Sequence, residues 1–575
     1  MRSLFPFLKP YRKECVLSPL FKLFEAVLEL FVPLIMAAII DNGIQARDTG
    51  YVLKMGLMLV GLGLLGFLTS ITAQYFAAKA AVGFAARLKA ALFAHIQRFS
   101  YTELDTLGAP TLINRMTTDM NQVQTGVNMT LRLLLRSPFV VVGAMIMAFT
   151  VDSRSALIFV ALIPLLALVV AGLMRLTLPR HKRVQGQLDR VLLTTRENLT
   201  GVRVLRAFGK QDDETAAYEA DTQRLSDMQQ RVGRLSALMN PLTYVLVNGA
   251  LAALLWSGAL QVQSGALTQG AVVALVNYLS QILVELIKFA NLIVTITKAV
   301  ACAGRIESVL HIQPSMAQPE RPVEAPGSAQ ECVRFESVSA RYQNAGGDSL
   351  SNISFTALRG QTIGVIGGTG SGKTTLVNLI PRFYDATQGR VLVNGVDVKQ
   401  QAMDALRQKI SVVPQKAVLF EGTIRENLLW GNLSATDEQL WRALETAQAA
   451  EVVRGKAGGL DEPVEQGGRN LSGGQRQRLT IARALVKQPE ILILDDSASA
   501  LDYATDAALR NSLRQMEGGA TVFIVSQRAS SIRHADLILV LDDGELVGSG
   551  THEQLLQGCP VYQEIYYSQY PKEAV

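Results

Sequence analysis

The sequence contains few charged residues and few cysteines, and each scarcity limits what the chain can be. Only 18% of its 575 residues are charged and 49% are apolar, whereas soluble globular proteins are about one quarter charged. Together with a mean hydropathy of +0.23, this composition indicates membrane-spanning segments. The four cysteines lack the paired spacing of a metal site, so we interpret them as reduced structural thiols. They are Cys15, Cys302, Cys332 and Cys559.

The first residues also lack the features of a cleavable signal. The segment from Met1 to Glu14 is basic and amphipathic, and no small-residue cleavage site follows a short apolar core. The net charge of +6 is modest, and we attribute it to loops facing an anionic membrane surface rather than to nucleic-acid binding. Because 575 residues exceed what one hydrophobic core supports, we expect at least two domains.

Six apolar segments before residue 300 are long enough to cross a membrane, which takes about 20 helical residues for roughly 30 Å of hydrocarbon. Three of their connections are short, and two are long and rich in Arg and Lys. The positive-inside rule therefore places the long connections and both termini in the cytosol. The predicted spans lie near residues 17–40, 52–78, 133–151, 156–178, 238–260 and 271–294.

Both long connections keep a helical periodicity, for example at Leu188, Val191 and Leu199, which predicts helices that continue past the bilayer. We expect them to turn back through short cross-pieces near Asp105–Thr111 and Leu199–Phe208. Disordered loops are the alternative.

Several charged residues lie inside the apolar segments. Ionisable groups in a membrane normally face a polar interior or pair with one another, so Glu29, Glu285 and Lys288 are candidates for a hydrated substrate cavity. The alternative is a structural ion pair between residues three or four apart, or snorkelling toward an interface. For Lys22 and Glu25 we favour the ion pair, and for Glu29 and Glu285 both interpretations stay open.

The character of the chain changes after residue 310. Residues 311–330 contain four prolines and few apolar residues, which predicts an extended linker. From Glu331 onward the pattern is that of an α/β domain. We therefore assign residues 1–310 to an all-α membrane domain, 311–330 to the linker and 331–575 to an α/β P-loop domain.

A glycine-rich loop follows a short strand predicted at Gln361–Ile366 and precedes a helix predicted at Thr375–Phe383. This is the context of G-x-x-x-x-G-K-[ST], whose backbone N–H groups cradle nucleotide phosphates. Lys373 can reach the β- and γ-phosphates of ATP, and Thr374 can ligate Mg²⁺. The predicted ATP-binding residues here are Gly367, Gly368, Thr369, Gly370, Ser371, Gly372, Lys373, Thr374 and Thr375.

A second apolar strand, predicted at Ile491–Leu494, ends in Asp495 and Asp496. An acid at the carboxyl end of such a strand suits a magnesium ligand, so Asp495 is assigned the Walker B role. These two motifs together indicate a P-loop ATPase.

The pentapeptide Leu471-Ser472-Gly473-Gly474-Gln475 makes this assignment more specific, because it stands directly before a helical segment, Arg476–Leu485. Here the chain resembles the ATP-binding cassette (ABC) transporters, whose signature is this pentapeptide. With six predicted spans first, it resembles their exporter-type half-transporters along its whole length.

The resemblance implies roles for further residues. It implies that the signature caps the γ-phosphate of ATP on the opposite cassette of a dimer, and that Asp502 lies in the loop crossing between cassettes. It implies that Tyr342 stacks on adenine, that Gln415 contacts Mg²⁺ and the membrane domain, and that Glu465–Gly468 touches the cross-pieces.

Two positions depart from the family pattern. The family has Glu directly after the Walker B Asp, where this chain has Asp496, and a switch His after the next strand, where this chain has Gln527. The two changes together resemble the degenerate-site subunit of heterodimeric ABC multidrug exporters. This resemblance implies a second half-transporter that supplies the catalytic Glu and the switch His.

We therefore expect one subunit of an ATP- and Mg²⁺-dependent exporter of amphipathic, drug-like compounds or lipids, with membrane lipids and a small-molecule substrate as further partners. The expected location is a bacterial plasma (inner) membrane, with the cassette in the cytosol. Six spans exclude an ATP-dependent nucleic-acid protein. An importer built on the exporter fold and an ATP-gated regulatory or sensor subunit stay open as alternatives.

Overall fold

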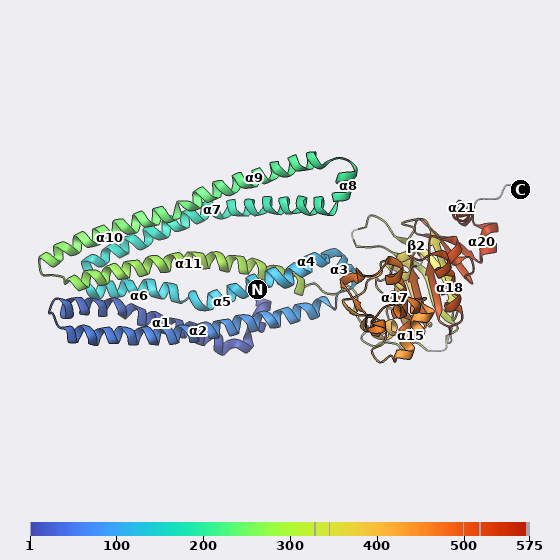
Figure 1. Cartoon of the computed structure of the whole chain (residues 1–575), viewed down its shortest axis with the longest axis horizontal. Coiled ribbons are helices and arrows are strands. Elements are labelled where there is room, and N and C mark those ends of the chain that lie inside the picture. Colours follow the sequence, from blue (N-terminus) through green and yellow to red (C-terminus); the bar gives the residue numbers. More distant parts are fainter. Residues whose placement is uncertain (1, 327–328, 344, 498, 517–518, 571–575) are drawn as a thin grey trace. The chain divides into compact units, whose positions relative to one another are not determined.

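The computed structural model describes residues 2–326, 329–343, 345–497, 499–516 and 519–570. It divides into two compact units, shown in Figure 1. The N-terminal unit comprises Met1–Gln97 and Pro110–Ile312, and the C-terminal unit comprises Arg98–Ala109 and Gln313–Val575. Most of the predicted linker, residues 313–330, thus belongs to the C-terminal unit. Residues 327–328 of this linker lie outside the described residues. The sequence assigned 98–109 to the membrane domain, and the structure groups them with the cassette instead.

Among the described residues, six helical stretches are long and apolar enough to cross a membrane, and each contains one predicted span. They are 42 to 53 residues long. At 1.5 Å per residue a helix of 48 residues measures about 72 Å, more than twice the hydrocarbon thickness. They are Ser3–Ile44, Thr49–Ile96, Ala109–Val151, Ser153–Thr200, Gln211–Gln263 and Gln269–Leu310.

These stretches contain regular α-helices with short 3₁₀ and π segments. Helix α1 packs against α2, α6 and α11, while α7 packs along α9 and α10 (Figure 1). The elements are η1 (Arg2–Tyr11), α1 (Arg12–Ala38), η2 (Ile39–Ile44), α2 (Thr49–Ile96), α4 (Ala109–Asn114), η3 (Arg115–Asp119), α5 (Met120–Leu133), α6 (Arg136–Val151), α7 (Ser153–Thr200), α9 (Gln211–Ala237), α10 (Met239–Gln263) and α11 (Gln269–Leu310).

Small side chains line the packed face of α2. Ala73, Ala77, Ala80 and Ala81 are fully buried, which lets helix backbones approach closely, as interfaces between membrane helices require. The opposite face carries large exposed apolar side chains such as Leu57. This division is typical of a helix between protein neighbours and lipid.

Two short helices lie where the long connections turn. Helix α3 (Tyr101–Leu107) begins at a capping box formed by Ser100 and Glu103, which satisfies free N–H groups of its first turn. It starts four residues before the predicted cross-piece at Asp105–Thr111. Helix α8 (Val202–Ala207) lies inside the predicted Leu199–Phe208. Both short helices therefore overlap the segments in which the sequence predicts cross-pieces.

The C-terminal unit is built on two main sheets. A six-stranded sheet has the order β12-β11-β3-β10-β9-β6, in which the last five strands run parallel, and a four-stranded antiparallel sheet has the order β2-β1-β4-β5. Together with the long apolar helices, these sheets confirm the predicted fold class. The strands are β1 (Glu331–Ala340), β2 (Leu350–Leu358), β3 (Thr362–Gly367), β4 (Gln388–Val393), β5 (Val396–Asp397), β6 (Ile410–Val413), β7 (Gly422–Thr423), β8 (Pro463–Val464), β9 (Ile491–Asp495), β10 (Thr521–Val525), β11 (Leu537–Asp542) and β12 (Glu545–Gly550).

The central strand β10 lies between β3 and β9, so their carboxyl ends meet at one edge of the sheet. Ligands of open α/β sheets bind at that edge. The helices of this unit are α12 (Lys373–Leu379), α13 (Met403–Lys409), α14 (Ile424–Leu429), α15 (Asp437–Thr446), α16 (Ala450–Arg454), α17 (Gly473–Val486), α18 (Tyr503–Arg514), α19 (Ala529–Ile532), α20 (His552–Gly558) and α21 (Pro560–Gln569).

Candidate functional site

The glycine-rich loop joins the end of β3 to the N-terminus of α12. Gly372 has φ of 92°, and a Cβ there would lie 2.6 Å from the carbonyl oxygen of Ser349, so only glycine fits. The Lys373 ammonium donates to the carbonyls of Gly367 (3.0 Å) and Gly368 (2.5 Å). The loop therefore curls around its own lysine, which holds a positive charge inside the curve.

Asp495, at the end of β9, faces this loop. The Thr374 hydroxyl donates to its carboxylate over 3.1 Å. Burial raises the pKa of Asp495, against the opposing effect of the Thr374 hydrogen bond. Burial lowers the pKa of Lys373, and the negative charges of Asp496 and Asp495 partly offset that effect. Burial thus disfavours the charged form of both groups, and a bound triphosphate with Mg²⁺ would bring opposite charges that favour it.

A cavity of about 420 Å³ opens in front of the loop. Its lining brings together most of the residues predicted to bind ATP and magnesium. Five further lining residues were not predicted, because no motif marks them: Asp348, Ser349, Val525, Asp543 and Gly544. The predicted residues in the lining are Tyr342, Thr369, Gly370, Gly372, Lys373, Thr374, Thr375, Gln415, Asp495, Asp496 and Gln527.

The two positions that depart from the family pattern lie in this cavity with Gln415. The Gln415 amide donates to the carboxylate of Asp496 over 3.2 Å. Asp496 has φ of 45°, a left-handed conformation that Asp and Asn adopt more readily than most residues. The side chain of Asp496 is therefore held beside Gln415 at the edge where strands β9 and β10 end.

Tyr342 stands at another wall of the cavity. Its hydroxyl lies 3.0 Å from that of Thr375, and its ring meets the ring of Tyr384 edge-on, with centroids 4.9 Å apart. Tyr384 in turn donates a 2.6 Å hydrogen bond to Asp105 of α3. Burial and that hydrogen bond raise the pKa of Tyr384. Helix α3 is thus connected to the cavity wall through the side chains of Tyr384 and Tyr342.

The signature lies elsewhere, since none of the described residues that line the cavity belongs to Leu471–Gln475. Ser472 caps α17 in a capping box with Gln475, and both Ser472 and Gly473 are exposed. Asp502 caps α18 by accepting from the backbone N–H of Thr505 at 2.8 Å. The helix N-terminus behind Ser472 is an anion-binding feature that is exposed and does not line this chain's own cavity.

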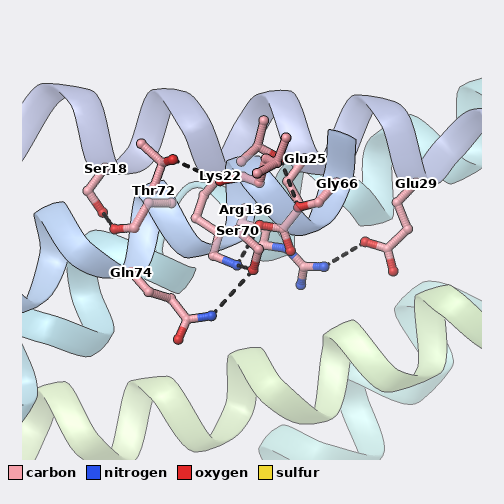
Figure 2. A network of polar contacts seen from close by, with 12 residues as sticks. Ser18, Lys22, Glu25, Glu29, Gly66, Ser70, Thr72, Gln74 and Arg136 are labelled. Carbon is pink, nitrogen blue, oxygen red and sulfur yellow. Dashed lines mark hydrogen bonds and ion pairs between the residues drawn. The ribbon is translucent and has the colours of Figure 1, made fainter. Parts of the chain in front are cut away.

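In the N-terminal unit, the predicted cavity residues belong to a network of ion pairs centred on Arg136 of α6. Arg136 donates to Glu285 of α11 (2.5 Å) and to Glu29 of α1 (2.6 Å), and Figure 2 shows its guanidinium directed at Glu29. Glu285 also accepts from Lys288 (2.9 Å) and from Ser137 (2.9 Å). Arg136 and Glu285 are both buried.

A second pair lies nearby on α1. Lys22 donates to Glu25 over 2.6 Å and to Ser70 of α2 over 3.0 Å, as Figure 2 shows. This is the ion pair that the sequence favoured. Arg136 was not singled out from the sequence, although an arginine inside an apolar segment signals a buried acidic partner.

Comparisons with known proteins agree with this architecture. Residues 15–286 match the family described as the ABC transporter transmembrane region, and residues 350–499 match the family described as ABC transporter. An uncharacterized ABC transporter ATP-binding protein of Mycobacterium bovis is 37% identical over 98% of this chain and 97% of its own length. An ATP-dependent lipid A-core flippase of Chromohalobacter salexigens is 30% identical over 99% of this chain and 98% of its own.

In fold, the chain is similar to a bacterial Atm1-family ABC exporter whose structure was solved with ATP bound. The TM-score is 0.81 at 22% sequence identity, and the match covers 98% of this chain and 99% of the other.

Proposed function

Because the chain belongs to the ABC transporters, as an exporter-type half with six apolar helices fused to one cassette, we propose that it is the weakly hydrolysing subunit of a heterodimer. It is an integral membrane protein and an ATP-driven half-transporter, and such halves act as dimers. The proposal concerns which of the two subunits of such a dimer this chain is. The observation that carries it is the presence of Asp496 and Gln527 in a cavity that is otherwise equipped for ATP.

Lys373, Thr374 and Asp495 support binding of Mg²⁺·ATP. The Thr374 hydroxyl oxygen and the Asp495 carboxylate oxygen lie 3.1 Å apart. Both are hard oxygen ligands of the kind that Mg²⁺ prefers. Bound magnesium would neutralise charge on the phosphates. Lys373 would hold the terminal phosphates and Tyr342 the adenine.

The side chains in this cavity are poorly suited to catalysing ATP hydrolysis. Asp is one methylene shorter than Glu, so its carboxylate retreats by about 1 Å, and a misplacement of that size costs on the order of 100-fold in rate. A positioned general base contributes about 10² to 10⁴-fold. Gln527 can donate a hydrogen bond to a γ-phosphate but cannot carry positive charge as histidine can. We infer that this site retains ATP and hydrolyses it slowly.

The intact signature supports a heterodimer. Leu471–Gln475 would serve little purpose in a homodimer with two weak sites. It is useful if it completes the competent site of a partner that supplies the catalytic Glu and the switch His. The exposure of Ser472 and Gly473 leaves them free to make that contact.

Retention of intact ATP tests the weak site. The full-length chain, incubated with Mg²⁺ and labelled ATP and passed rapidly over a desalting column, should carry mostly ATP rather than ADP. Lys373→Ala, which removes the phosphate-binding ammonium, should carry neither. Recovery of mainly ADP from the wild-type chain would contradict slow hydrolysis.

For the substrate, we propose amphipathic compounds or lipids moved outward. The lipid A-core flippase named above is a relative of nearly equal length, and the Arg136 network offers polar groups inside an apolar unit. The test is ATP-driven transport in inside-out vesicles that contain the chain and its partner. Accumulation of substrate inside indicates export, depletion indicates the importer alternative, and ATPase activity without transport indicates the sensor.

A further inference from the structure

The last helix of the chain, α21, reaches the segment that carries Gln527. At its final residue, the Gln569 side-chain amide donates to the carbonyl of Gln527 over 2.7 Å. Its side-chain oxygen accepts from the backbone N–H of Ala529 over 2.9 Å. One side chain thus bridges both ends of the tripeptide Gln527–Ala529, which we call the switch segment.

The switch segment needs such a partner. Strand β10 ends at Val525, and α19 begins at Ala529, so the N–H of Ala529 belongs to a first helical turn and has no partner within that helix. Gln569 provides the missing acceptor. On another side, the Arg528 guanidinium donates to the carbonyls of Ser499 and Leu501, both over 3.3 Å, which ties the segment to the loop before α18.

Helix α21 is itself firmly anchored. Tyr562 is fully buried, and its hydroxyl lies 2.8 Å from Nδ1 of His552 in α20. Gln563 donates to the carbonyl of Leu556 over 2.7 Å. Ile565 and Tyr566 pack against the hydrophobic core that lies under the sheet. Gln569 therefore extends from a fixed helix, and its two hydrogen bonds transmit that fixed position to the switch segment.

We propose that Gln569 is a positioning residue of the ATP site: it holds the backbone at Gln527 so that the Gln527 side chain lies in the ATP cavity. The inference rests on the proposed contact between Gln527 and the γ-phosphate, and it makes α21 part of the nucleotide site although no motif includes it.

Release of nucleotide from the full-length chain in lipid nanodiscs tests this role. Labelled Mg²⁺·ATP or Mg²⁺·ADP is bound and then chased with excess unlabelled nucleotide. Gln569→Ala should speed the release of ATP about tenfold, since a hydrogen bond to a charged group contributes about that factor or more. Release of ADP, which has no γ-phosphate, should change less than about twofold. Gln563→Ala, a glutamine of the same helix that contacts α20 instead, is the matched control and should change neither.

A cycle with Gln527→Ala locates the effect. If Gln569 acts through Gln527, then Gln527→Ala alone speeds ATP release, and adding Gln569→Ala to it speeds release no further. Equal acceleration of ATP and ADP by Gln569→Ala, or an added effect in the Gln527→Ala background, would overturn the inference. If Gln527→Ala acts and Gln569→Ala does not, the inference fails while the role of Gln527 stands. If Gln527→Ala leaves ATP release unchanged, the inference about Gln569 and the proposed contact of Gln527 with the γ-phosphate both fail.

Discussion

Asp496 differs from the glutamate that the family pattern has at this position by one methylene, and Gln527 differs from histidine by the loss of a titratable ring. Both are small changes in volume, and both side chains still line the cavity beside Gln415. Their effect is therefore on chemistry rather than on folding. In the proposed function, these two changes weaken hydrolysis and leave the phosphate loop intact.

Restoring the two family residues should restore hydrolysis. The double variant Asp496→Glu with Gln527→His, purified as the full-length chain, should turn over ATP at least tenfold faster than the wild type, because a positioned base contributes about 10² to 10⁴-fold. Part of that gain is lost because glutamate adopts the positive φ of residue 496 less readily than aspartate does. Phosphate release measures the rate, and Lys373→Ala in the same background should abolish the gain. An unchanged rate would mean that these residues do not limit hydrolysis.

Arg136 is the residue on which the polar network of the N-terminal unit depends. It bridges Glu29 and Glu285, which lie on α1 and α11. The side chain of Glu285 is 4% exposed and that of Glu29 is 42% exposed, so the two ion pairs should differ in energetic weight.

Substitutions should reveal that difference. Arg136→Met leaves the buried Glu285 with Lys288 as its remaining ion-pair partner. It should destabilise the chain by up to about 3–5 kcal/mol, the usual cost of removing one partner of a buried ion pair. Glu29→Gln should cost less, because it leaves the buried ion pair between Arg136 and Glu285 in place. Thermal unfolding in detergent measures both. If Glu29→Gln or Glu285→Gln instead alters substrate preference while basal ATP hydrolysis survives, the residues line a substrate pathway.

At the scale of elements, hydrophobic runs were sufficient to predict the six long helices, because each must match the bilayer and each run has the required length. Their full lengths were harder to define, since the extensions carry ordinary amphipathic patterns. The start of α3 at Tyr101 was missed because its signal is local: Ser100 and Glu103 form a capping box that looks like many other Ser-x-x-Glu sequences.

Pairings between distant elements could not be predicted in the same way. The phosphate loop, the Walker B acid and the signature are contiguous motifs, so their residues were found from the sequence. Arg136 pairs with carboxylates 107 and 149 positions away, and Gln569 meets a segment about 40 positions before it. No spacing rule connects such residues, because only the packing of helices brings them together.

The orientation of the helices gives a prediction at this scale. A cysteine placed at Ser264, an exposed residue between α10 and α11, should react with an impermeant thiol reagent in intact cells. A cysteine at Gln185, exposed on the extension of α7, should react only after permeabilisation. Labelling of the α7 site alone in intact cells would reverse the assigned orientation.

At the scale of the whole molecule, this chain is one half of a transporter. It has one phosphate loop and one signature, and the signature does not line the cavity that the phosphate loop forms. This separation agrees with the proposed ATP site, which is completed by the signature of a second chain. If the partner is a second copy, both sites contain Asp496 and Gln527; if it is a different half, one site can be fully competent.

ATP turnover by the chain alone and by its complex distinguishes these two dimers most directly. The chain is purified by its own tag, first from cells expressing it singly and then from cells that co-express its partner. We predict little turnover by the chain alone and robust turnover by the complex. In the complex, Asp496→Asn should change the rate only modestly, whereas removal of the partner's Walker B glutamate should abolish it. Vigorous turnover by the chain alone, lost on Asp496→Asn, would contradict the heterodimer and make Asp496 the working base of a homodimer.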